Sequence, residues 1–248
     1  YRLSPHSTLK QDMIFYADSP RVDFETCVDW NDKHRLLKVA FDVSVRSDYV
    51  TQEIQYGNIK RTTKRNTSTE QAAFEVCNHK YTDISEPGYG IAILNDCKYG
   101  ISVNGSTLAL TLHKGGCNPD VRGDVGVHGF TYSFLPHEGG FAADTTIRQG
   151  YLLNCPMLVS EGSKAIQKLL SVDKSNIVVE VIKPCEESEK AFIARLYEAE
   201  GTYTNTTLLT DMKISSMKIC DMLENEQEDT DGNLSFCPFE IKTLKLSY

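Results

Sequence analysis

The chain lacks the closely spaced cysteines and histidines from which zinc and redox sites are usually built. Its eight cysteines lie 17 or more residues apart and form no CxxC pair, whereas zinc ribbons and redox motifs need that close pairing. Its six histidines form no HxH or HxxxH pair, and no GxSxG, P-loop or dinucleotide-binding sequence occurs. The sequence therefore predicts no metal site, no nucleotide site and no set of catalytic residues within this chain.

Long apolar runs and concentrated positive charge are also missing. The longest apolar stretches, such as 91–94 and 177–179, fall far short of the roughly 18 residues that a membrane helix needs. No membrane span is predicted. The net charge is −8 and the lysines and arginines are scattered, which argues against nucleic acid and anionic membranes as partners.

Two opposing features bear on the cellular compartment. The first residues, YRLSPHSTLKQ, have no basic start followed by an apolar run, so we expect no signal peptide in them. Widely spaced cysteines are typical of free thiols in a reducing compartment. Four N-x-S/T sequons favour the opposite, although such triplets are common by chance; they begin at Asn66, Asn104, Asn205 and Asn233. On balance the sequence predicts a cytoplasmic protein.

Alternating apolar and polar residues dominate the first 150 residues. The segments LLKVAFDVSV (36–45), TLALTLH (107–113) and HGFTYSF (128–134) have the period of two that half-buried strands require. Asn104-Gly105 predicts a type I′ hairpin. About eight to ten strands would form a large β-sandwich, and further strands are predicted at 49–56, 73–81 and 89–94.

The pattern changes near residue 150, where we place a boundary between domains 1–150 and 151–248. AADTTIRQGYLLN (142–154) predicts a short helix with Asp144 as its cap, and the acidic run ENEQEDTDGN (224–233) predicts a solvated loop. Turn-linked short strands in the second domain predict an immunoglobulin-like sandwich; they are expected at 176–183, 191–200, 206–211, 213–220 and 239–246. The predicted fold class is all-β.

Carboxylates are the remaining candidates for chemistry. A glycosidase needs two of them, about 5 to 5.5 Å apart if it retains configuration. Asp96, Asp120 and Asp124 each lie in or beside a turn rich in Gly, Asn and Pro, and functional side chains are common in such loops. Capping of the turn by Asx hydrogen bonds is the alternative for each. None of the three is singled out as a nucleophile.

Three ordered blocks carry a resemblance to a known family: YGNIKRTTKRNTS (56–68), AAFEVCNHKYTDISEPGYGIAILNDCKYGISV (72–103) and PDVRGDVGVHGFTYSFLPH (119–137). They resemble the C-terminal region of glycoside hydrolase family 38 α-mannosidases, most of all the bacterial, fungal and cytosolic branch. Supporting segments upstream and downstream extend the resemblance over nearly the whole chain. It implies that the large sandwich is of the galactose mutarotase-like, or supersandwich, type.

The resemblance also implies that the chain is part of an enzyme that hydrolyses terminal α-linked mannose with retention. In this family the nucleophile and the zinc ligands lie in an N-terminal catalytic domain, which a helical bundle follows. Both domains, and the zinc, are therefore expected outside this chain, which alone is expected to be inactive. Mannose-containing oligosaccharides are the implied substrates. The β-module of the family can lend side chains to the active-site rim, and the matching positions here are Arg61, Asn66, Asn95, Asp96, Lys98, Tyr99, Asp120, Asp124 and His128.

Some positions depart from the family pattern, and some candidates have structural alternatives. Thr62-Thr63-Lys64 and Thr69-Glu70 replace usual motif residues, and Lys114 stands where the family commonly has arginine, which removes any bidentate contact there. The alternative for Tyr99 is that it only starts a strand, and the alternative for Arg61 is that it pairs with an acid at a domain interface. The alternative function is a stand-alone carbohydrate-binding or adhesion module.

Overall fold

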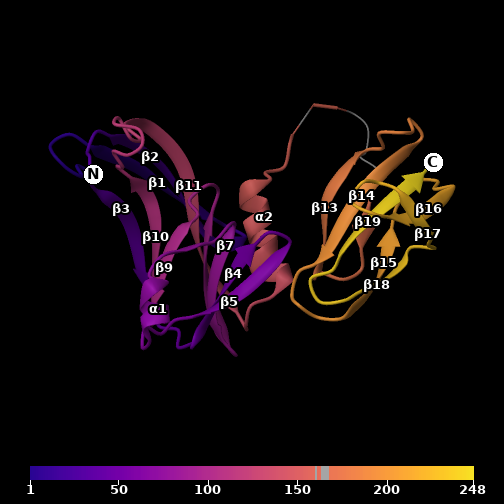
Figure 1. The fold of residues 1–248 in the computed structure, drawn as a ribbon, viewed down its shortest axis with the longest axis horizontal. Coiled ribbons are helices and arrows are strands. Elements are labelled where there is room, and N and C mark those ends of the chain that lie inside the picture. The colour runs from indigo at the N-terminus through magenta and orange to yellow at the C-terminus, as the bar shows by residue number, and fades with distance from the viewer. Residues whose placement is uncertain (160, 163–167) are drawn as a thin grey trace. The chain divides into compact units, whose positions relative to one another are not determined.

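The computed structural model describes residues 1–159, 161–162 and 168–248, which fall into two compact units. The first unit comprises residues 1–54 and 59–157, and the second comprises residues 158–248 together with 55–58. Their strands and helices are labelled in Figure 1. No helix in the described part of the chain is long and apolar enough to span a membrane.

The first unit contains two antiparallel sheets. The seven-stranded sheet has the order β1 (Thr8–Tyr16), β2 (Ser19–Trp30), β11 (Gly126–Glu138), β8 (Tyr89–Asn95), β7 (Tyr81–Glu86), β4 (Tyr49–Ile54) and β5 (Gly57–Thr62). The four-stranded sheet has the order β3 (Leu36–Asp42), β10 (Thr107–Lys114), β9 (Gly100–Asn104) and β6 (Val76–Cys77).

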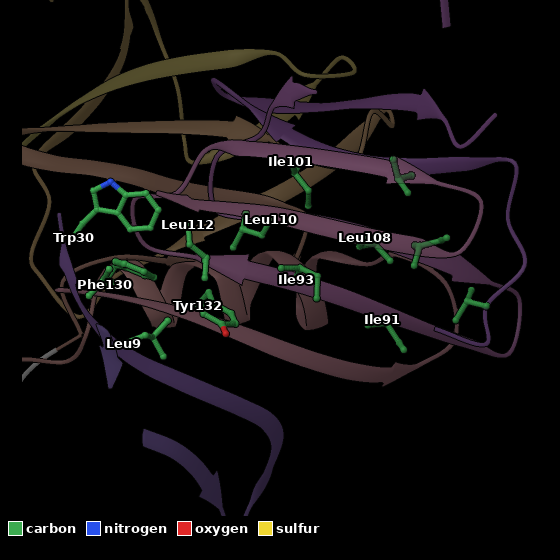
Figure 2. Packing of buried hydrophobic residues seen from close by; sticks show 14 residues of the cluster. Leu9, Trp30, Ile91, Ile93, Ile101, Leu108, Leu110, Leu112, Phe130 and Tyr132 are labelled. Atoms are coloured by element: carbon green, nitrogen blue, oxygen red, sulfur yellow. The ribbon is translucent and has the colours of Figure 1, made fainter. Parts of the chain in front are cut away.

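The core of this unit lies between the two sheets, because each sheet turns one apolar face inward. Leu108 and Leu110 of β10 are fully buried, as is Ile101 of β9. In Figure 2 their side chains lie opposite Ile91 and Ile93 of β8. Period-two alternation therefore has its expected physical cause, since successive side chains of a strand point to opposite faces.

Five of the six strand segments predicted for the first unit coincide with strands, whereas β1, β2, β5 and β7 were not predicted and the prediction for 73–81 was wrong. That segment contains only the two-residue strand β6, and the helix α1 (Ser68–Ala72) precedes it. Thr67 caps α1, and Glu70 completes a capping box by accepting from the Thr67 amide, so the local hydrogen bonds favour a helical turn. The unit has eleven strands, which exceeds the predicted eight to ten.

The hairpin at Asn104 is confirmed, but its predicted type is wrong. Asn104 pairs with Thr107, so the two loop residues are Gly105 and Ser106. Only Gly105 has a positive φ, of 57°, whereas a type I′ turn needs positive φ at both central residues. Gly105 therefore supplies the positive φ that the first loop position needs, and Ser106 does not need one.

A short helical segment follows β11. A π-helix, η1 (Ala143–Ile147), runs directly into α2 (Arg148–Asn154). The predicted helix is confirmed, but Asp144 does not cap it. Ala142 occupies the N-cap position without a side-chain hydrogen bond, and Asp144 lies within the first turn, where its charge still suits the helix N-terminus.

The described residues of the second unit form two sheets that enclose an apolar core. The three-stranded sheet has the order β12 (Ser171–Val172), β15 (Thr204–Leu209) and β18 (Asn233–Phe236). The five-stranded sheet has the order β13 (Ile177–Pro184), β14 (Ala191–Glu198), β19 (Ile241–Ser247), β16 (Ser216–Cys220) and β17 (Glu226–Asp229). The core residues include Leu196, Leu244, Leu234 and Phe236.

The acidic run 224–233 was predicted to be a loop, and this prediction is wrong in part. Residues 226–229 form β17, an exposed edge strand that pairs with β16. Glu226 forms ion pairs with Lys218 and with Lys245, so basic side chains of neighbouring strands neutralise its charge. Charged residues are common on edge strands, because they oppose edge-to-edge aggregation.

Candidate functional site

A polar cleft of about 320 Å³ opens where the β8–β9 turn, β10 and the start of β11 meet. Its lining includes Lys98, Tyr99, Asp124 and His128, four of the predicted rim residues. The structure thus brings together residues from the second and third motif blocks. The remaining lining residues are Cys97, Thr111, Leu112, His113 and Lys114.

The β8–β9 turn at one side of the cleft is held by two predicted residues that lie behind it. The buried Asn95 donates from Nδ2 to the His79 carbonyl at 2.7 Å and accepts at Oδ1 from the Lys98 amide at 2.8 Å. Asp96 accepts at Oδ2 from the Thr131 amide of β11 at 2.8 Å. Asn95 and Asp96 therefore fix the turn that carries Lys98 and Tyr99.

A buried hydrogen-bond chain connects Arg61 to the same turn. Arg61 donates from Nη1 to Gln52 Oε1 at 2.6 Å, and Gln52 donates to Thr82 Oγ1 at 3.2 Å. Thr82 donates to Asn78 Oδ1 at 3.1 Å, and Asn78 donates from Nδ2 to the Tyr99 carbonyl at 3.0 Å. Such a network rigidifies the structure when every member is satisfied. Arg61 thus lies at the far end of a chain of contacts that ends at the cleft.

A pair of histidines anchors the loop at the other side of the cleft. Nε2 of His113 and Nε2 of His128 lie 3.0 Å and 2.8 Å from the backbone carbonyl of Asp124, and the two rings are 4.5 Å apart. A carbonyl only accepts hydrogen bonds, so both Nε2 atoms carry a hydrogen. Burial, and then the neighbouring His128, lower the pKa of His113. His113 is therefore neutral at pH 7.

The side chains that face the cleft combine a cation, an aromatic ring and a carboxylate. Nζ of Lys98 lies 4.3 Å from the centre of the Phe130 ring, and Tyr99 is 48% exposed. Asp124 is exposed. Lysine donates hydrogen bonds, a carboxylate accepts them and an aromatic face packs on apolar surface. This set can bind a small polyhydroxylated ligand.

Cys97 also lines the cleft, but it is a poor nucleophile. Burial, and then the neighbouring Asp96 carboxylate, raise the pKa of the Cys97 thiol to about 11. The thiolate is the reactive form of cysteine, so Cys97 is almost entirely protonated at pH 7. None of the eight cysteines, all of which lie in the described part of the chain, forms a disulfide.

The remaining predicted residues lie outside the cleft lining. Asp120 is exposed and accepts at Oδ1 from the Arg122 amide at 2.9 Å, which is the capping contact expected of an Asx turn. Asn66 is exposed beside α1, and its backbone amide donates to Glu70 at 2.7 Å. The structure therefore places these two side chains apart from Lys98, Tyr99 and His128.

Among the cleft residues that the sequence did not indicate, His113 has the most direct structural role, because it anchors the loop of Asp124. In TLALTLHK it follows the last leucine of the alternation, and a register shift between Thr111 and His113 disturbs the pairing of β10 with β3. Such irregularities re-aim side chains and occur often beside functional sites. Its partner His128 lies on another strand, so sequence spacing gives no signal of the pair.

The described residues do not fit a zinc site. No group of three or more His, Cys, Asp or Glu side chains in that part of the chain is arranged to hold a metal ion. A structural or catalytic zinc needs at least three protein ligands. The two neighbouring histidines, His113 and His128, are too few, and both already use Nε2 for the Asp124 carbonyl.

Family models match most of the chain. Residues 1–122 match the glycosyl hydrolases family 38 C-terminal domain, and residues 176–244 match the glycosyl hydrolases family 38 C-terminal beta sandwich domain. The fold and the two matches define the chain as the all-β C-terminal region of a glycoside hydrolase.

Curated relatives and solved structures agree with these matches. The chain is 38% identical over 258 residues to alpha-mannosidase 2C1 of Homo sapiens, covering 99% of this chain and 25% of the relative. Alpha-mannosidase G of Dictyostelium discoideum is 37% identical, with 98% of this chain and 24% of the relative covered. The crystal structure of an alpha-mannosidase from Enterococcus faecalis V583 superposes with a TM-score of 0.81 at 17% identity, over 96% of this chain and 28% of that one.

The chain belongs to glycosyl hydrolase family 38 and corresponds to the C-terminal region of its α-mannosidases. It spans about a quarter of the length of the curated relatives that it matches.

Proposed function

We propose that the chain is the non-catalytic β-region of an α-mannosidase that hydrolyses terminal α-linked mannose with retention. The observation that carries this proposal is the match of 98–99% of the chain to about a quarter of each of two relatives named as alpha-mannosidases. The partners would be a catalytic portion and a helical portion of the same polypeptide, and the substrates mannose-containing oligosaccharides. We place the boundary between the two β-domains near residue 150 and the enzyme in the cytoplasm.

In this proposal the polar cleft forms part of the active-site rim. Lys98 would donate to sugar hydroxyls, Asp124 would accept from them, and the exposed ring of Tyr99 would pack on the apolar face of a pyranose. His128 would hold the loop that carries Asp124. Lys114, which lines the same cleft, replaces the family's arginine with a single ammonium group and so offers no bidentate contact.

The other predicted residues would act through the residues that line the cleft. Asn95 and Asp96 would position Lys98 and Tyr99, and Arg61 would do so through the buried hydrogen-bond chain. Asp120 and Asn66 would contribute turn and helix-entry contacts. The zinc that the family context implies would be bound by the catalytic portion, since the described residues here do not provide its ligands.

Two activity measurements test the proposal. The 248-residue chain alone, assayed with zinc and 4-nitrophenyl α-mannoside, is expected to show no turnover; substantial turnover would refute the assignment of catalysis to another portion. In a full-length enzyme that carries this chain, Tyr99→Ala is expected to lower kcat/KM about ten-fold, equivalent to about 1.4 kcal/mol. Tyr49→Ala, at an exposed tyrosine outside the cleft, is the matched control.

A binding titration separates this function from a stand-alone carbohydrate-binding module. If the chain supports a separate catalytic portion, mannose should not bind saturably to the isolated chain, because rim contacts alone are few. Saturable binding of mannose at millimolar or lower concentration, abolished by Tyr99→Ala, would instead identify an independent sugar-binding module.

A further inference from the structure

A second pocket, of about 210 Å³, lies in the first unit between β5, α1 and the Val103 end of β9. It shares no lining residue with the polar cleft. Three basic residues and one acidic residue line it: Arg61, Lys64, Arg65 and Glu70. Its apolar lining consists of Val50, Ala73, Val76 and Val103. The pocket therefore combines excess positive charge with an apolar wall.

Two of the four charged side chains already have contacts within the protein. Nζ of Lys64 lies 2.9 Å from Oδ2 of Asp48. The Glu70 carboxylate accepts from the backbone amides of Thr67 and Asn66, which hold the pKa of Glu70 below its ordinary value. Glu70 is therefore ionised at pH 7 and lines the pocket, but it forms no ion pair with Arg61 or Arg65 in the described part of the chain.

Arg61 and Arg65 have no carboxylate partner among the residues that the structure describes. Burial lowers the pKa of Arg61, which reflects the cost of moving a cation away from water without a counter-ion. Arg65 is also half-buried. An anion in the pocket would relieve this cost.

Each guanidinium also has nitrogens that donate to no described acceptor. Arg61 uses only Nη1, for Gln52 Oε1 and for the Cys77 carbonyl at 3.0 Å. Arg65 uses only Nη2, for the carbonyls of Phe74 and Val103 at 3.3 and 3.4 Å. Nε and Nη2 of Arg61 remain, and these adjacent N–H groups can bind a carboxylate or phosphate in bidentate fashion. Nε and Nη1 of Arg65 remain as separate single donors.

We propose that this pocket binds a small anion, with a carboxylate or phosphate group held by Arg61 and Arg65 and any apolar part against Val50, Val76 and Val103. The site is separate from the polar cleft, and its ligand would be an anion and not a neutral sugar. The backbone contacts of both arginines preorganise the site, because they fix the guanidinium groups before a ligand arrives.

Calorimetric titration of the 248-residue chain with three probes tests the proposal. Inorganic phosphate tests the phosphate group, benzoate tests a carboxylate with an apolar ring, and benzamide is the uncharged match of benzoate. Benzoate or phosphate, or both, are expected to bind saturably in the millimolar range or tighter, with affinity falling as salt is added. Benzamide is expected not to bind. Which anion binds more tightly identifies the ligand group.

Variants locate the binding. Arg65→Gln and Arg61→Lys are each expected to weaken anion binding ten-fold or more, the latter because lysine lacks the planar fork. Arg61→Lys keeps a donor for Gln52, so folding is preserved, and the fluorescence of the buried Trp30 reports it. Arg35→Gln, at an exposed arginine that does not line the pocket, should bind as the unmodified chain does. Absence of saturable binding by both anions, or unchanged affinity in folded Arg65→Gln, would overturn the proposal.

Discussion

Replacement of Glu198 by glutamine is expected to destabilise the second unit selectively. Glu198 ends β14, and its side chain is 0% exposed. Its Oε1 accepts from Asn176 Nδ2 at 3.0 Å, the Glu200 amide at 2.8 Å and Thr202 Oγ1 at 3.2 Å. Its Oε2 accepts from the amides of Gly201, Thr202 and Phe239 at 2.7, 3.0 and 3.1 Å. One carboxylate thus closes the loop after β14 and ties it to the segment before β19.

The expected magnitude follows from the donors that lose their acceptor. Glutamine replaces one carboxylate oxygen with an NH₂ group. At the Oε1 position two amide donors then face another donor, because the Thr202 hydroxyl can rotate to accept, and at the Oε2 position three backbone amides do. Each unsatisfied buried group costs about 1–3 kcal/mol. Relaxation of the loop offsets part of this, and we expect a loss of about 3–5 kcal/mol in the free energy of unfolding, at the large end for single substitutions.

Two probes assign the loss to one unit. Trp30, the only tryptophan, lies in the first unit, so its fluorescence reports the unfolding of that unit. Hydrogen exchange of the β14 and β19 amides reports the second. In Glu198→Gln these amides should exchange faster, while the urea midpoint by Trp30 fluorescence stays unchanged. Glu226→Gln, at a partly exposed carboxylate with two lysine partners, is the control with a small effect.

The pH dependence provides an independent check. Burial raises the pKa of Glu198, but hydrogen bonds from the amides of Phe239, Glu200 and Thr202 outweigh it, and the net pKa lies below the ordinary 4.5. A depressed folded-state pKa contributes stability above pH 4.5 that is lost as the pH falls through the folded value. If Glu198→Gln leaves both β14 exchange and this acid sensitivity unchanged, the reasoning is refuted.

Three further predictions concern the first unit. Gly90→Ala places a Cβ against the ring of His137 and should cost about 1–3 kcal/mol by urea unfolding, whereas Gly129→Ala, with open space around its Cβ, should cost less. Burial lowers the pKa of His137, but the hydrogen bond and charge of Asp83 have the larger, opposite effect, so the net pKa lies above 6.5. The stability that this group contributes should be full below pH 6.5 and lost as the pH rises through the folded-state pKa. His137→Gln should abolish that pH dependence of the free energy of unfolding. Asp96→Asn should lower the pKa of Cys97, and alkylation followed by mass spectrometry should show faster modification of that thiol at pH 8; an unchanged rate would contradict the assigned contact.

Burial of one face imposes an alternation on the sequence, and strands such as β10 were predicted for this reason, although β2, which also buries one face, was not. Leu108 and Leu110 alternate with residues of the opposite face of β10, and the structure buries both completely. The acidic strand β17 was not predictable in this way, since both of its faces are exposed. It pairs with β16, and Glu226 forms ion pairs with Lys218 and Lys245, which come from other strands. Non-local contacts override local composition there.

The cleft was predictable only in part. The motif blocks identified Lys98, Tyr99, Asp124 and His128 as candidates, and all four line one cleft in the structure. The motif resemblance carries no information about which matching residues face the cleft and which support it from behind. That distinction depends on the three-dimensional structure, because Asn95, which supports the turn, and Tyr99, which lines the cleft, belong to the same motif block.

The buried hydrogen-bond chain explains why polar residues occupy the interior of the seven-stranded sheet. Gln52, Thr82 and Asn78 are fully buried, and buried polar groups add little net stability compared with well-packed apolar ones. Their contacts instead connect β4, β7 and the segment after β6 to the backbone of Tyr99. A chain that required only stability would be served by apolar residues at these positions. The polar set therefore makes structural sense as a positioning device, and Arg61 connects it to the proposed anion pocket at its other end.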